Sequence, residues 1–189
     1  MNSFINACLK ISPLSIEAQT DLDLKIKTKF LKKNEILFKI GSVCNSLLFI
    51  KSGLLQHELY LEDKKFILKF FSENEFCAVI ESFALRFPNE YQTIAKEDTE
   101  FEYISYEDFM NLCSKHHCVE TLYRKILTNT IITLITRRKG ISIQSAREKY
   151  ELFLKEFGHL NNRLSLGDIA CFLGITQVSL SRLRKKRSK

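Results

Sequence analysis

The segment Leu166–Arg184 places small, capping and apolar residues at the spacing of two short helices joined by a tight turn. Ala170 is small where two helices would cross closely, and Gly174 tolerates the positive φ that such a turn requires. Thr176 is of the type that caps a following helix. The apolar positions that would pack the two helices together are Ile169, Leu173, Ile175, Leu180 and Leu183. This pattern is that of a helix-turn-helix, although an unrelated helical hairpin can also produce it.

The second helix of such a motif would begin at Thr176 and expose polar and cationic side chains on one face. In a helix-turn-helix this face enters the major groove of DNA, where arginine binds guanine and glutamine binds adenine. We therefore expect base contacts from Gln177, Val178, Ser181 and Arg182. Phosphate contacts, which fix position without reading sequence, are expected from Thr176, Ser179, Arg184, Lys185, Lys186 and Arg187. The alternative for Arg182 is a surface ion pair with a nearby carboxylate.

The formal net charge of the 189-residue chain is +7, and most of that charge lies near the C-terminus. Residues 141–189 contain ten Lys and Arg against four Asp and Glu, which leaves a net charge of only +1 for residues 1–140. Cations beside a helix-turn-helix pattern favour DNA as the partner, because neutralising phosphates dominates nucleic-acid affinity. A basic end without such a motif is often only a solvated tail.

Other residues that could carry chemistry give weaker patterns. Cys113, His116, His117 and Cys118 are potential metal ligands, but they lack the two separated ligand pairs of a zinc site. We expect no metal there and interpret the cluster as a helix with two cysteines near its apolar side. The chain has no glycine-rich phosphate loop and no nucleophile with a recognisable base, so we expect it not to be an enzyme.

A long apolar stripe precedes the C-terminal segment and predicts a helix through residues 106–139. A stripe of this length must be buried on its own domain or on a second copy of the chain, and we favour the second copy. The residues expected at that dimer interface are Leu122, Ile126, Ile131 and Leu134. Ser105 and Ser114 are candidate N-caps within this region.

The N-terminal part consists of short strand-like runs separated by turn signals, after a short helix predicted at residues 15–24. The runs lie at residues 35–40, 47–51, 54–61, 66–71, 91–95 and 100–105. Short strands without long intervening helices predict an antiparallel barrel or roll. The fold class is therefore α+β, with a β-roll at residues 1–110, a dimerisation helix and hinge at 111–140, and a helix-turn-helix domain at 141–189.

This layout resembles the Crp-Fnr regulators, the relatives of the cyclic AMP receptor protein. The residues that carry the resemblance are Ile40-Gly41, Leu48 to Gly53, Ile104 to Tyr106, Ile169-Ala170, Leu173 to Thr176 and Leu180 to Arg182. The resemblance implies a cyclic-nucleotide-binding-like β-roll as sensor. It also implies a homodimer that binds a two-fold symmetric site in double-stranded DNA near promoters, with RNA polymerase as a further partner.

The chain departs from the family at the positions that would bind cofactors. Relatives that bind cyclic nucleotides hold the phosphate with a Gly-Glu pair and a later arginine. The matching region here offers Glu81, Ser82, Arg86 and Asn89, and Glu90 follows where the arginine is expected. A carboxylate there would repel a phosphate, which argues against cyclic AMP and leaves the small-molecule effector unknown. Only Cys8 lies near the N-terminus, which argues against an iron-sulfur cluster.

The sequence therefore predicts a sequence-specific DNA-binding transcription regulator. The alternative is a small-molecule-binding β-roll module whose C-terminal part contacts other proteins. No apolar run approaches the ~20 residues of a membrane span, and the first ten residues lack a signal-peptide pattern, so we expect a cytoplasmic protein without membrane contact.

Overall fold

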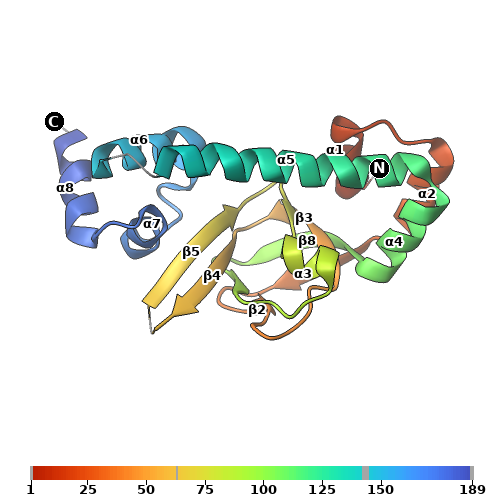
Figure 1. The fold of residues 1–189 in the computed structure, drawn as a ribbon, viewed down its shortest axis with the longest axis horizontal. Helices are drawn as coiled ribbons and strands as arrows, with labels where there is room; N and C mark the ends of the chain where they lie inside the picture. Colours follow the sequence, from red (N-terminus) through yellow and green to blue (C-terminus); the bar gives the residue numbers. More distant parts are fainter. Residues whose placement is uncertain (1, 63, 142–144, 188–189) are drawn as a thin grey trace. The chain divides into compact units, whose positions relative to one another are not determined.

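The computed structural model describes residues 2–62, 64–141 and 145–187, with the backbone alone at 137–141 and 186–187. The strands are concentrated between residues 27 and 105, and long helices follow them toward the C-terminus (Figure 1). Within the described residues, no helix combines the length and apolar character needed to span a membrane.

The strands of the described part form two four-stranded sheets, with the orders β1–β8–β3–β6 and β2–β7–β4–β5. β3 pairs antiparallel with β8, which places Leu48 opposite Tyr103, and β1 pairs antiparallel along the other edge of β8. The strands are β1 Lys27–Leu31, β2 Ile36–Phe38, β3 Ser46–Ser52, β4 Leu55–Leu61, β5 Lys64–Phe71, β6 Phe76–Cys77, β7 Gln92–Ala95 and β8 Thr99–Ser105. The short runs in the sequence thus become the predicted antiparallel roll.

A turn in the roll depends on glycine. Gly53 has a φ of +99°, and a Cβ at this position would lie 2.5 Å from the carbonyl oxygen of Asp98. The turn that the sequence predicts at residue 53 therefore needs a residue without a side chain. It lets the chain pass directly from β3 to β4, close to the start of β8.

Helices α1 (Ser3–Ile11) and α2 (Ile16–Lys25) precede the roll, and α3 (Ile80–Leu85) interrupts it. The sequence predicts α2 but not α1 or α3. Helix α1 begins where Asn2 Oδ1 and the buried Glu102 carboxylate both accept hydrogen bonds from the Phe4 amide, at 3.0 and 2.7 Å. The Phe4 and Cys8 side chains of α1 are fully buried in the core with the sheet residues.

Two helices follow β8, where the sequence predicts one helical region. Ser105 caps α4 (Tyr106–Lys115) as predicted, because its Oγ accepts the Asp108 amide at 3.1 Å. Ser114 does not cap a helix, since it lies inside α4 and donates to the Met110 carbonyl. The backbone becomes extended at His116, and the long helix α5 (His117–Ile141) begins after it.

The chain divides into two compact units that do not follow simple sequence order. The first comprises residues Met1–His57 and Phe70–Ile131, and the second comprises Glu58–Lys69 and Ile132–Lys189. The tip of the β4–β5 hairpin therefore groups with the C-terminal helices. The domain boundaries expected near residues 110 and 140 do not assign this part of the hairpin to the C-terminal unit.

The helices of the second unit pack around an aromatic core. They are α6 (Ala146–Phe157), the short 3-10 helix η1 (Gly158–Leu160), α7 (Leu166–Leu173) and α8 (Gln177–Arg187). Ser145 and Glu148 form a reciprocal capping box that starts α6. The Phe172 ring of α7 packs against Phe153 and Phe157 of α6, with ring centroids 6.1 and 5.6 Å apart. This packing fixes α7 on α6.

Candidate nucleic-acid interface

Helices α7 and α8 are joined by a turn of three residues, at the place where the sequence predicts it. Gly174 ends α7 in the left-handed conformation with a φ of +64°, as its position in the motif requires. The Ile175 amide then bonds to the Ala170 carbonyl at 3.0 Å, which closes the turn. Ala170 is only 2% exposed, consistent with a close helix crossing.

Thr176 caps α8, which confirms its predicted structural role. Its Oγ1 accepts the Ser179 amide at 3.1 Å and lies 2.9 Å from the Ser179 hydroxyl. The two hydroxyls expected at phosphates therefore contact each other at the start of α8. Leu180, on the inner side of the helix, is fully buried, so the orientation of α8 is fixed.

The outer face of α8 carries the side chains expected at base edges. Gln177 and Arg182 are exposed, Val178 is 60% exposed, and Ser181 is half-buried. The Gln177 amide lies over the start of α7, since a Cβ added to Gly167 would lie 2.9 Å from Gln177 Nε2. The glycine leaves room for this side chain, and the sequence alone did not indicate that link.

The guanidinium of Arg184, which the sequence places at a phosphate, bonds within the protein in this structure. Its guanidinium donates to the Asn161 carbonyl at 3.2 Å and to Asn161 Oδ1 at 2.8 Å. The Tyr150 hydroxyl donates to the same Oδ1 at 3.3 Å. Arg184 thus joins α8 to the loop after η1. Sequence position alone could not separate it from its exposed neighbour Lys185.

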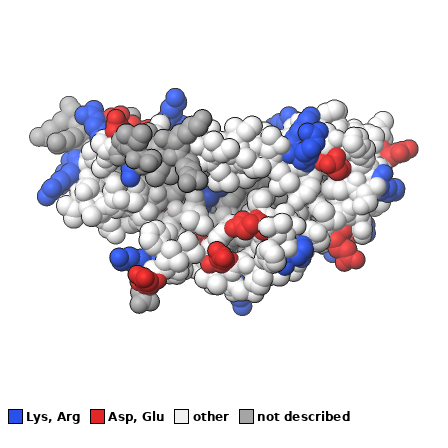
Figure 2. All heavy atoms as spheres, in the orientation of Figure 1, with Lys and Arg blue, Asp and Glu red and all other residues white. Residues whose placement is uncertain are grey.

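The remaining cations of α8 that the sequence places at phosphates are Lys185, Lys186 and Arg187. Lys185 is exposed and, with Arg182, lines a hollow of about 440 Å³ that is completed by Ala146, Ser179 and Leu183. Figure 2 shows blue Lys and Arg side chains at the surface of the C-terminal helices. The side chains of Lys186 and Arg187, also expected at phosphates, lie outside the described residues.

The stripe of α5 divides into a covered part and an open part. Leu122 and Ile126 are 0% and 7% exposed in the core of the first unit, so they cannot face a partner helix as expected. Ile131 and Leu134 are 56% and 58% exposed. Their neighbours Ile132 and Ile135 are similarly open, at 56% and 52%. Only the open part remains available to a second chain.

The cysteine and histidine cluster is spread over different contacts. His116 Nε2 lies 2.6 Å from Asp21 Oδ2, while Cys118 Sγ lies 3.9 Å from Ser15 Oγ. Cys113 is half-buried, and burial raises the pKa of its thiol to about 11. The His117 side chain is 91% exposed. Among the described residues, no group of three or more His, Cys, Asp or Glu side chains is arranged to hold a metal ion.

Comparison with known proteins matches part of the sequence to one domain family and most of the architecture to solved structures. Residues 28–116 match the cyclic nucleotide-binding domain, which spans β1 to α4. FixK2 from Bradyrhizobium japonicum superposes with a TM-score of 0.76 at 14% identity, covering 86% of this chain and 84% of its own. A protein described as a Crp/Fnr-family regulator, from Eubacterium rectale, gives a TM-score of 0.73 at 17% identity, with coverages of 93% and 84%. The chain has the Crp/Fnr fold.

The structure of a CooA variant from Carboxydothermus hydrogenoformans is also similar to this chain. Its TM-score is 0.69 at 21% identity, and the match covers 95% of this chain and 82% of that one. No curated protein matches the chain significantly in sequence. The identities are low while the coverages are high, so the likeness to the Crp/Fnr proteins lies in the arrangement of the elements.

In this chain with the Crp/Fnr fold, three of the side chains expected around an effector bond to the backbone of other residues nearby. The Ser82 hydroxyl is 1% exposed, donates to the Phe87 carbonyl and accepts the Cys44 amide at 2.9 Å. Arg86 donates to the Cys44 carbonyl at 2.8 Å, bonds to Asn45 and lies over the Tyr106 ring.

Asn89 completes this loop and Glu81 lies outside it. The Asn89 side chain is 3% exposed, and its Nδ2 donates to the Lys39 carbonyl at 3.2 Å. Glu81 is exposed and lies near the Tyr91 hydroxyl, whose pKa is raised by burial first and by the Glu81 charge second. Ser82, Arg86 and Asn89 thus bond to backbone groups of the same unit, while Asn89 Oδ1 is buried without a hydrogen-bond partner among the described residues.

Proposed function

We propose that the protein is a transcription regulator that reads double-stranded DNA with the outer face of α8. The observation that carries the proposal is the contrast between the two sides of that helix. Leu180 is fully buried and Thr176 caps the helix, whereas Gln177, Val178 and Arg182 are exposed on a rigidly held element. A recognition helix needs this combination of a fixed position and open side chains.

The comparisons support a regulator over the alternative of a β-roll module with a protein-binding tail. FixK2 and CooA share the arrangement of the elements, and the Eubacterium rectale protein is described as a transcriptional regulator. The positive charge of residues 141–189 fits DNA as the partner, because phosphates attract cations without regard to sequence.

Selection of binding sites from random duplex DNA tests the proposal. We expect a two-fold symmetric site with half-site centres about 34 Å apart. Arg182→Ala should lower discrimination at one base pair of each half-site by about 1–3 kcal/mol. Lys155→Ala, at an exposed position of α6, removes one charge and should leave that discrimination unchanged. Binding that ignores sequence and depends only on salt would contradict the proposal and favour the alternative.

We propose further that the protein acts as a homodimer through the open part of α5. Four exposed apolar residues of this part, Ile131, Ile132, Leu134 and Ile135, recur at spacings of three and four along one helix. Leu134→Asp should therefore convert the dimer to a monomer in analytical ultracentrifugation and abolish the preference for symmetric sites. Leu24→Asp is the matched control, because Leu24 is 76% exposed on α2. An unchanged mass for the Leu134 variant would exclude this interface.

RNA polymerase as a partner and a small effector in the β-roll complete the proposal. In vitro transcription from a promoter that carries the selected site tests the first. We expect initiation to change when the protein is added and to return to its basal level with Arg182→Ala.

A further inference from the structure

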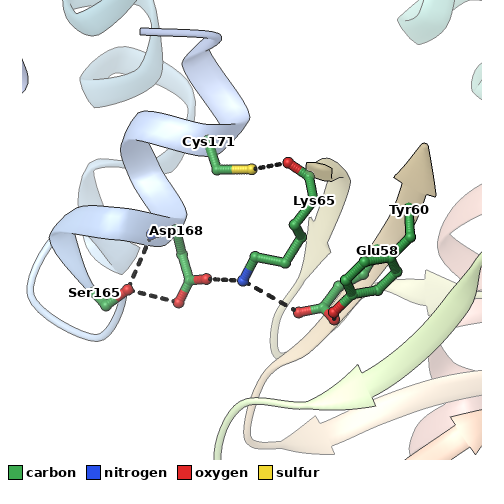
Figure 3. Close-up of polar contacts among 6 residues, drawn as sticks. All are labelled: Glu58, Tyr60, Lys65, Ser165, Asp168 and Cys171. Carbon is green, nitrogen blue, oxygen red and sulfur yellow. Dashed lines mark hydrogen bonds and ion pairs between the residues drawn. The ribbon is translucent and has the colours of Figure 1, made fainter. Parts of the chain in front are cut away.

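The tip of the β4–β5 hairpin contacts the first helix of the DNA-reading motif within the second unit (Figure 3). The ammonium of Lys65, at the start of β5, lies 2.9 Å from Asp168 Oδ1 on α7. The Cys171 thiol, one helical turn further along α7, donates to the Lys65 carbonyl at 2.9 Å. One hairpin residue thus contacts α7 through both its side chain and its backbone.

The electrostatics of the contact make it sensitive to the loss of Lys65. The Asp168 and Glu58 side chains are only 7% and 4% exposed, and the Lys65 ammonium also lies 3.6 Å from Glu58 Oε1. Burial alone would lower the pKa of Lys65, but Asp168 and Glu58 outweigh it and raise that pKa. Removal of Lys65 would take its ammonium away from both buried carboxylates, which is unfavourable. Separation of α7 from the hairpin would relieve that cost.

The carboxylates are also held in place on their own elements. Asp168 Oδ2 accepts from the Ser165 hydroxyl at 2.8 Å, and Ser165 Oγ accepts the Asp168 amide at 3.0 Å, so the carboxylate is part of the α7 N-cap. On the hairpin, Glu58 Oε2 accepts from the Tyr60 hydroxyl at 2.9 Å. Lys65 therefore connects two preorganised groups, and α7 has a defined position on the hairpin.

We propose that Lys65 is a positioning residue for DNA binding, which holds α7, and through it α8, in the orientation that receives DNA. This inference rests on the proposed function of α8. The hairpin lies on the face of α7 that carries Asp168 and Cys171, while Gln177, Val178 and Arg182 of α8 stay exposed. Docking therefore leaves the base-reading side chains open.

The position of the contact gives the sign of the effect. Lys65 bonds to α7, and the turn of residues 174–176 joins α7 to α8, so the docked hairpin restrains the helix that would read DNA. A restrained helix loses less freedom when it binds, so release of the hairpin should weaken binding to a specific site.

The comparison of Lys65→Met with Lys64→Met tests the inference. Lys64 is exposed beside Lys65, so both variants lose one charge while only the first loses the contact. Lys65→Met should bind the selected DNA site about tenfold more weakly than Lys64→Met at the same salt concentration. Both variants should bind nonspecific DNA equally. Equal affinities for the selected site would overturn the positioning role.

The alkylation rate of Cys171, followed by peptide mass mapping, reports on the contact without any DNA. In the docked state the thiol is half-buried, and burial raises its pKa. Release of the hairpin should therefore make Cys171 react faster in Lys65→Met and in Asp168→Asn, but not in Lys64→Met. Faster alkylation without any specific DNA binding by the parent protein would refute only the proposed function. Identical alkylation in Lys65→Met and Lys64→Met would refute the contact itself.

Discussion

Polar side chains lie both on the outer face of α8 and in the segment from Ser82 to Asn89, but they are exposed in the first region and mostly bonded to the backbone in the second. On α8, Gln177 and Arg182 extend from a capped and packed helix and are exposed. In the β-roll, Ser82 and Asn89 are almost fully buried and bond to backbone groups of the same unit. Polar residues at a family's ligand position can therefore serve the fold, while open ones on a rigid support are better placed for a partner.

The largest effect is expected from removing the buried hydroxyl of Ser82. Ser82→Ala leaves the Cys44 amide and the Phe87 carbonyl without this partner inside the protein. It should lower the free energy of unfolding by about 1–3 kcal/mol in urea titrations, and DNA site preference should not change. Ser114→Ala, at an exposed hydroxyl, should change that free energy by less than about 0.5 kcal/mol. An unchanged free energy of unfolding in Ser82→Ala would contradict a structural role for this hydroxyl and so the difference between the two regions.

Arg184 and Lys185 allow the same contrast to be drawn within one helix. Arg184→Ala should lower the free energy of unfolding by about 1–2 kcal/mol, because both bonds to Asn161 are lost. Its slope of log affinity against log salt should match that of the parent protein. Lys185→Ala should leave stability unchanged and reduce that slope by about 1. Exchange of these two outcomes would mean that Arg184 leaves Asn161 to contact DNA.

Gly167→Ala tests how the open face is positioned. The new methyl group would lie 2.9 Å from Gln177 Nε2 and should displace that side chain. Stability should rise by at most about 1 kcal/mol, since alanine favours a helix over glycine, while base preference at the Gln177 position should change. Gly158→Ala is the control, because nothing lies within 4 Å of its added Cβ. Melting curves and site selection measure the two effects separately.

The smallest effect concerns the partly exposed carboxylate of Asp21, which belongs to neither region. Hydrogen bonds from Lys115 and His116 hold the pKa of Asp21 below its usual value near 3.8. A depressed folded-state pKa gives stability that is present above the unfolded pKa and lost as pH falls through the folded pKa. Asp21→Asn should thus lower the free energy of unfolding at neutral pH, and the difference from the parent protein should shrink as pH falls below about 4. Denaturant titrations at several pH values measure this difference.

Local signals made much of the fold and part of the site predictable. The strand runs, the Ser105 and Thr176 caps and the Gly174 turn each depend on residues within a few positions of one another. The exposed β1 and the helix α1 lacked such signals, since β1 is largely polar and α1 depends on the distant Glu102 carboxylate.

The features that could not be predicted from the sequence depend on contacts between residues that are far apart in the chain. Leu122 and Leu134 belong to one stripe, but Leu122 is buried by the packing of its own unit while Leu134 is exposed. Arg184 and Lys185 are adjacent cations, and only the location of Asn161 separates their roles. The contact between Lys65 and Asp168 has no local pattern at all.

The pairing of the hairpin tip with α7 also has a consequence for synthesis. Lys65 leaves the ribosome 103 residues before Asp168, which at about 5–20 residues per second is a delay of roughly 5–20 s. During that interval β5 is a sheet edge with Phe66 and Leu68 exposed and no α7 to contact. Such an edge can pair with other nascent chains, so we expect the newly made hairpin to be exposed to aggregation until α7 is made.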